Sequence, residues 1–199
     1  MLAIESGFSS INLEFIALIW NTFSVALLAS LLCISLAIIL VYGKRLVSGK
    51  ISATSLRLAT SGYAIPGTVI AIGILMVLLT IDRALNIFLT GSILALLFAY
   101  TARFIALSAQ SIESGLEQIS PSIDESSQML GVTSFKTIRS IHFPLLRGSI
   151  MTASLLVFVD VLKELPATLI LRPFDFNTLA VKTYELAGDE RLSDASLPA

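Results

Sequence analysis

The chain has 199 residues, of which 55% are hydrophobic and 14% are charged, whereas soluble domains carry about 25% charged residues. The formal net charge of −1 gives no support for a nucleic-acid-binding protein. With one cysteine, Cys33, and one histidine, His142, an internal disulfide is excluded and a Cys/His metal site cannot be assembled. The charged residues avoid several long apolar runs, which indicates a membrane protein.

The first apolar run reads FIALIWNTFSVALLASLLCISLAIILVYG and has no charge between Glu14 and Lys44. A helix needs about 20 apolar residues to cross a bilayer core of about 30 Å. The run therefore predicts a membrane span at about 14–42. The run is too long for a cleaved signal peptide, and it lacks the basic head that such a peptide has.

Two further apolar runs follow in chain order. The run LATSGYAIPGTVIAIGILMVLLTI predicts a span at about 60–81, in which Pro66 marks a helix start or a kink. The run TGSILALLFAYTARFIALSA predicts a third span at about 90–110. This span contains Arg103, whose side chain we expect to reach the lipid headgroups. Small residues that should let helices approach closely are Ala26, Ala29, Gly67 and Gly73.

Residues 117–146 form a polar stretch between two apolar runs. Ser122 and Glu125 have the spacing of a capping box, in which a hydroxyl precedes a carboxylate by three residues at a helix start. We expect this first short helix to end near Leu130. Gly131 suits the position just after a helix, where the backbone is often left-handed.

A second short helix is expected to begin near Thr133. It should end at Phe143 and Pro144, because the residue before a proline resists the helical conformation. His142 is expected to be an exposed loop residue near the membrane surface. Two amphipathic helices joined by a glycine elbow would make a docking surface, and a plain solvated loop is the alternative.

The fourth apolar run predicts a span at about 148–170. Because successive spans cross the membrane in alternate directions, the loops 43–57 and 117–146 are expected to lie on the same side of it. Seven Lys or Arg residues lie on that side and four on the other, where acidic residues dilute them. Because basic residues favour the cytoplasm, both loops are predicted to be cytoplasmic, and residues 1–13 and 171–196 periplasmic. The seven basic residues are Lys44, Arg45, Lys50, Arg57, Lys136, Arg139 and Arg147.

The polar stretch resembles the EAA loop of ABC importer permeases. That loop has a glutamate and two small residues, then a glycine, an isoleucine and a proline placed six, sixteen and nineteen residues after the glutamate. Serines replace both alanines here, and their small size should preserve the docking geometry. The matching residues are Glu125, Ser126, Ser127, Gly131, Ile141 and Pro144.

The resemblance extends to YTARFIALSAQSIESGLEQI and to LKELPATLILRPFDF, which look like the C-terminal half of ferric-iron ABC permeases. It covers residues 14–199 and implies an all-α, polytopic, type I importer permease bundle in the bacterial inner membrane, incomplete at both ends. It also implies cytoplasmic ATPase subunits that bind ATP and Mg, a periplasmic solute-binding protein, and an N-terminal permease half or a second permease copy.

By this resemblance Glu125 caps and charges a coupling helix, Gly131 allows the elbow, and Ile141 and Pro144 hold the loop against the fourth span. The chain has no GxxxxGK[ST] loop, so we expect ATP hydrolysis by a partner and neither an enzyme nor a cofactor here.

Asp160, Lys163 and Glu164 interrupt the fourth span and share one helix face. Since a charge in lipid costs about 2.5–3.5 kcal/mol, they should face protein or water. In a structural interpretation Lys163 pairs with Asp160 or Glu164. In a functional interpretation the carboxylates line the pathway and meet a cation, and ferric iron is a hard cation that prefers oxygen ligands of this kind. Pro166 should kink or end the span.

Three alternatives to a ferric-iron permease remain open. The chain can serve another periplasmic solute, such as thiamine, a polyamine or a phosphonate. It can also be a membrane scaffold that recruits a partner without moving solute. Finally, it can be a fragment or a truncated gene product, because a pathway needs more wall than four helices supply.

Overall fold

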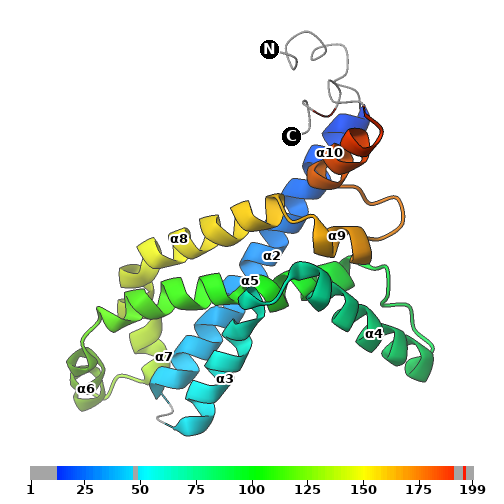
Figure 1. Ribbon diagram of the computed structural model, residues 1–199. Helices are drawn as coiled ribbons and strands as arrows, with labels where there is room; N and C mark the ends of the chain where they lie inside the picture. Colours follow the sequence, from blue (N-terminus) through cyan, green and yellow to red (C-terminus); the bar gives the residue numbers. More distant parts are fainter. Residues whose placement is uncertain (1–12, 47–48, 191–194, 196–199) are drawn as a thin grey trace.

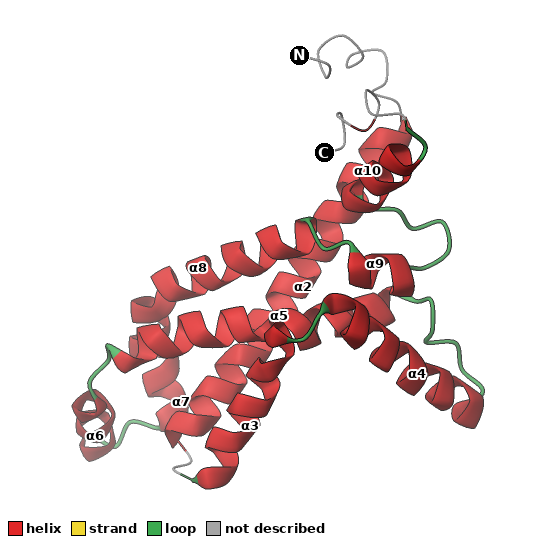
Figure 2. Ribbon diagram, in the orientation of Figure 1, coloured by secondary structure: helices red, strands yellow, loops and turns green. Residues whose placement is uncertain are grey.

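The computed structural model describes residues 13–46, 49–190 and 195. Within these residues the chain consists of helices joined by loops, with no strand (Figure 2). The expected periplasmic segment 1–13 lies outside the described residues except for Leu13, as does most of 191–196. The fold is therefore the all-α polytopic bundle that the sequence predicts.

In the described part of the chain, four helices are long and apolar enough to cross a membrane. They are α2 (Leu13–Leu46), α4 (Gly67–Leu85), α5 (Ile93–Glu117) and a continuous helix over Ser134–Leu162. The last comprises α7 (Ser134–Thr137), the π-helical turn η2 (Ile138–His142) and α8 (Phe143–Leu162). The shorter helices are α3 (Lys50–Thr60), η1 (Ser61–Ala64), α6 (Pro121–Met129), α9 (Pro166–Leu171) and α10 (Leu179–Gly188).

Helices α2, α5 and α8 pack against one another and form the core of the bundle (Figure 1). Their contact faces carry small residues, which allow helix backbones to approach closely where no hydrophobic effect drives association. On α2 the fully buried positions include Ala26, Ala29, Cys33 and Ala37. The expectation of close packing is thus confirmed for Ala26 and Ala29.

Helix α4 begins against α5 and α9 and then extends away from the three-helix core (Figure 1). Ala71, Ile74 and Leu78 are buried along its inner face, whereas most of its apolar side chains are exposed. A Cβ added at Gly73 would have no atom within 4 Å. The expected packing role of Gly73 is therefore wrong, because this glycine lies on a face of α4 that no described helix covers.

The loop between α4 and α5 is defined by local chemistry. Asn86 adopts a left-handed conformation with φ of 52° and ends α4. The Asp82 carboxylate accepts hydrogen bonds from the backbone N–H groups of Leu89, at 2.8 Å, and Thr90, at 2.9 Å. Ser92 then caps the first turn of α5 through its side chain.

The two ends of the bundle carry different elements. At one end α10 lies beside the start of α2 (Figure 1), where the Leu179 N–H donates to Thr22 Oγ1 at 2.9 Å and Asn21 donates to the Asn177 carbonyl at 3.2 Å. At the other end α6 and α7 lie near the end of α2 and beyond the end of α5. The polar stretch 117–146 thus projects from the end opposite α10.

Candidate functional site

The polar stretch begins with a different cap from the one that the sequence predicts. Ser120 is the N-cap of α6, and its side chain accepts a hydrogen bond from the Ser122 N–H. Pro121 occupies the first position of the helix, where its missing N–H costs nothing. The Ser122–Glu125 capping box is therefore wrong, because a capping serine and proline two and one residues earlier start the helix sooner.

The end of α6 follows the prediction. Leu130 is the C-cap, and Gly131 has a φ of +73°, which is left-handed backbone that glycine adopts without strain. The Gly131 N–H donates to the Gln128 carbonyl at 2.9 Å. Thr133 then starts α7. We call residues 121–137 the elbow.

The first three matching residues of the elbow differ in exposure. Glu125 and Ser126 are exposed, and Ser126 Oγ donates to the Ser122 carbonyl at 2.7 Å. Ser127 is buried. One small side chain of the pair thus faces the bundle, while the other lies on the outer face with the glutamate.

The second short helix of the polar stretch does not end at Pro144. The chain runs through it as one helix, with the π turn η2 immediately before α8, where Pro144 stands in the first turn. A proline ring clashes with the carbonyl four residues earlier in a regular helix, and the wider π turn removes that regular register. The predicted helix end at Phe143 and Pro144 is therefore wrong.

His142 is buried with 1% of its surface exposed, not an exposed loop residue. Its ring stacks on Tyr42 of α2, with 5.7 Å between the ring centroids. Ile141 is half-buried and Pro144 is exposed. The continuous helix turns His142 toward α2, which a loop assignment could not predict.

The elbow carries an exposed apolar surface that sequence reasoning described only in part. Met129, Leu130 and Phe135 are 90%, 81% and 73% exposed and lie on both sides of Gly131. Soluble surfaces seldom place such side chains together without a partner. Together with Glu125 they form a candidate docking surface.

A second group of charges lies where α8 ends. Lys163 Nζ is 2.8 Å from Asp160 Oδ1, and Tyr63 of η1 donates to Asp160 Oδ2 at 3.3 Å. This is the Lys163–Asp160 pairing of the structural interpretation. Helix α8 ends at Leu162 and α9 begins at Pro166, so the predicted interruption near this proline is confirmed. The predicted shared helix face is wrong, because Lys163 and Glu164 lie beyond the end of α8, in the break before α9.

Glu164 is buried, and its Oε1 is 2.9 Å from Arg103 Nη1 of α5. The same oxygen accepts a hydrogen bond from the Ala167 N–H, in the first turn of α9, at 3.3 Å. A Cβ on Gly67 would lie 1.7 Å from Arg103 Nη1 and 2.7 Å from Glu164 Oε1. Arg103 is thus held by a carboxylate inside the bundle instead of reaching the headgroups, since an ion pair is cheaper than a lone charge in lipid.

Within the described residues, no three His, Cys, Asp or Glu side chains come together as metal ligands. The two charged groups instead couple helices: Asp160 to η1, and Glu164 to α4, α5 and α9. Neither site contains a nucleophile paired with a base. The arrangement can dock a partner at the elbow and hold charge inside a membrane bundle.

The fold and these sites define a class of multi-pass membrane protein with a polar loop that projects from one end of the bundle. Residues 34–180 match the family described as binding-protein-dependent transport system inner membrane component, and the chain belongs to that family. It is a multi-pass protein of the bacterial inner membrane and a permease component of such transport systems. The family consists of transport permeases, which have no cofactor of their own, and not of enzymes.

Two curated relatives are similar to the chain. It is 28% identical over 183 residues to the Fe(3+)-transport system permease protein FbpB 2 of Haemophilus influenzae, covering 92% of this chain and 35% of the relative. It is 30% identical over 109 residues to the ferric transport system permease protein FbpB of Actinobacillus pleuropneumoniae, covering 55% of this chain and 15% of the relative. The chain therefore spans about a third or less of the relatives that it matches.

Proposed function

We propose that the chain is a permease subunit of an ATP-driven importer of ferric iron. The observation that carries the proposal is the similarity over 92% of the chain to a permease named for Fe(3+) transport. ATP and Mg would be bound by cytoplasmic ATPase subunits, and ferric iron would be delivered by a periplasmic binding protein. A second permease half or copy would complete the wall of the pathway.

The elbow is the surface at which the ATPase docks. Its exposed apolar side chains Met129, Leu130 and Phe135 offer a contact area, and the exposed Glu125 offers a charge beside it. Gly131 gives the turn between the two short helices. Closure of the ATPase dimer would displace the elbow and rock the attached spans between outward and inward openings.

Asp160, Lys163 and Glu164 belong to the pathway wall in this proposal, with different tasks. Asp160 and the exposed Lys163 lie at the break between α8 and α9, where helix ends offer backbone carbonyls. Carboxylate oxygens suit a hard cation such as ferric iron. Glu164 lies behind them and holds Arg103.

Asp160→Asn tests the pathway role. It removes a charge and leaves a side chain of the same size, so uptake of iron should fall about tenfold while the amount of protein in the membrane stays unchanged. The assay is radioactive iron uptake normalised to immunoblotted permease. An equal loss of uptake and of membrane protein would favour a purely structural Asp160.

The proposed function is tested on the complete transporter, reconstituted with the ATPase and the binding protein of the same transport system. Purification of the tagged chain should retain the ATPase, and reconstituted vesicles should accumulate ferric iron only with ATP and with iron-loaded binding protein. Accumulation of thiamine, a polyamine or a phosphonate in place of iron would reassign the solute. Absence of the ATPase from the purified complex would contradict the importer.

A further inference from the structure

The end of α2 is tied to two other elements through one guanidinium group. Arg45 Nη1 donates to the Leu116 carbonyl at 2.8 Å, and Nη2 donates to the Ile119 carbonyl at 3.1 Å. The Leu116 carbonyl lies in the last turn of α5 and also accepts from the Ile119 N–H at 3.1 Å, and the Ile119 carbonyl lies just beyond the end of this helix. Arg45 Nε also donates to Asp124 Oδ2 of α6 at 2.8 Å, and Nη2 lies 2.7 Å from the same oxygen.

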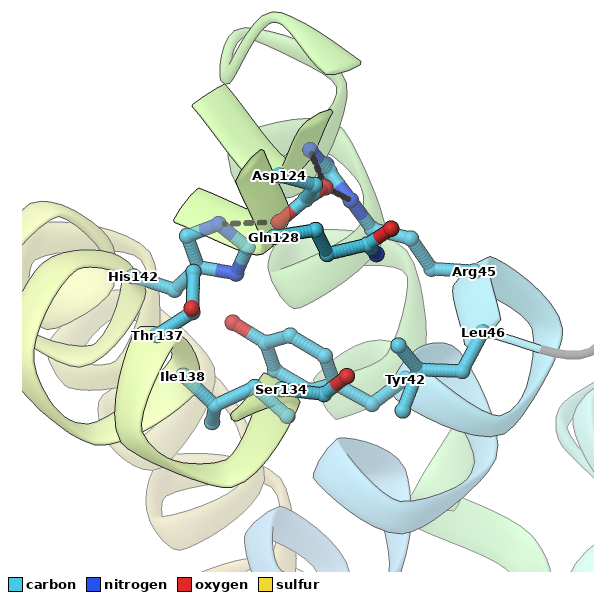
Figure 3. A pocket seen from close by; sticks show the side chains of 9 residues that line it. All are labelled: Tyr42, Arg45, Leu46, Asp124, Gln128, Ser134, Thr137, Ile138 and His142. Atoms are coloured by element: carbon cyan, nitrogen blue, oxygen red, sulfur yellow. Dashed lines mark hydrogen bonds and ion pairs between the residues drawn. The ribbon is translucent and has the colours of Figure 1, made fainter. Parts of the chain in front are cut away.

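The second oxygen of Asp124 reaches the start of the fourth span. His142 Nε2 of η2 lies 3.0 Å from Asp124 Oδ1, and Figure 3 shows the carboxylate between the imidazole and the guanidinium. His142 is itself fixed by stacking on Tyr42. One carboxylate on the elbow thus contacts groups from α2 and η2, and through Arg45 it is linked to α5.

Apart from these polar contacts, α6 is held by the half-buried Ile123, which packs against the apolar cluster formed by α2, α5 and α8, and by Ser127. Ser127 is the one residue of α6 that is fully buried. Asp124 is a quarter exposed and Arg45 less than a fifth, so their charge-assisted hydrogen bonds are less screened than those of a surface pair. The neighbouring Glu125 points into solvent. The two adjacent carboxylates therefore lie in different environments.

We propose that Asp124 is a positioning residue that transmits displacement of α6 to α2, to α5 and to η2 at the start of the fourth span. The proposal rests on the docking role of the elbow under the proposed function. Glu125 would face the ATPase, and Asp124 would link that contact to the spans. Loss of Asp124 should let α6 move without moving α2 and α5.

The attachment of α6 to the bundle through Asp124 can be measured without any partner protein. Ser127→Cys is a small change at the buried position of α6, and the native Cys33 is fully buried and thus protected. In membranes, Ser127→Cys should react slowly with maleimide. Adding Asp124→Asn should raise the rate about tenfold, since a charge-assisted bond has been lost, whereas adding Glu125→Gln should leave it unchanged. Equal rates in the two double variants would overturn the proposal.

The transmission is measured in the complete transporter as ferric iron imported per ATP hydrolysed. Asp124→Asn should lower this ratio at least severalfold while the ATPase still copurifies, and Asp124→Glu should restore part of it. An unchanged ratio would make Asp124 only a structural contact and would overturn the proposal. If the unmodified chain bound no ATPase, the docking role of the elbow would fail, and transmission through Asp124 would fail with it. The labelling rates would still decide whether Asp124 attaches α6 to the bundle.

Discussion

At Gly131 the backbone is left-handed, with φ of +73°, and a Cβ added there would meet no atom within 4 Å. A side chain at this position is therefore disfavoured by backbone conformation and not by packing. Gly91, in the loop between α4 and α5, has the same two properties, with φ of +72°. The two glycines differ in what their loops are proposed to contact.

Alanine at either glycine should cost about 1–2 kcal/mol of local stability, the usual cost of left-handed backbone for a residue with a Cβ. Gly131→Ala should also lower transport per ATP hydrolysed, because the turn between the docking helices changes. Gly91→Ala should leave this ratio unchanged. Vesicle uptake with a parallel ATPase assay measures both, and an equal effect of the two variants would remove the special role of Gly131.

At the scale of elements, α4 is attached to the bundle mainly at its beginning. There Gly67 lets the Arg103–Glu164 pair lie directly on its backbone. The pair joins α5 to the break between α8 and α9, so three elements meet at a position without a side chain. Most of the rest of α4 is exposed.

Gly67→Ala should displace the Arg103 head group and weaken its pairing with Glu164. Breaking a buried ion pair costs about 3–5 kcal/mol, and the partial exposure of Arg103 should reduce this to about 2 kcal/mol. Gly73→Ala is the matched control on the same helix, where space is open and alanine is a better helix former. Thermal unfolding in detergent measures both; a stable Gly67→Ala protein would contradict this account of α4.

The sequence predicts the long helices better than the contacts between them. Apolar runs of membrane length are strong signals, and the left-handed Gly131 follows from a local rule. Arg103 and Glu164 are 61 residues apart, so no local pattern could pair them. Proline chemistry predicted a helix end at Pro144, whereas a π turn lets the helix continue and buries His142.

At the scale of the whole molecule, the described helices present two kinds of unpartnered surface. The outer faces of α2, α4 and α8 expose apolar side chains, and the elbow exposes apolar and charged side chains at one end of the bundle. The first suits lipid or another permease half. The second belongs in water against a protein, so its side of the membrane decides whether an ATPase can reach it.

The account therefore depends most on the location of the elbow. Met129→Cys and Phe88→Cys place thiols at positions that are 90% and 94% exposed, on the elbow and on the loop between α4 and α5. In intact cells a membrane-impermeant maleimide should label Phe88→Cys and should label Met129→Cys only after the membrane is opened. Ready labelling of Met129→Cys in intact cells would place the elbow in the periplasm and contradict the account.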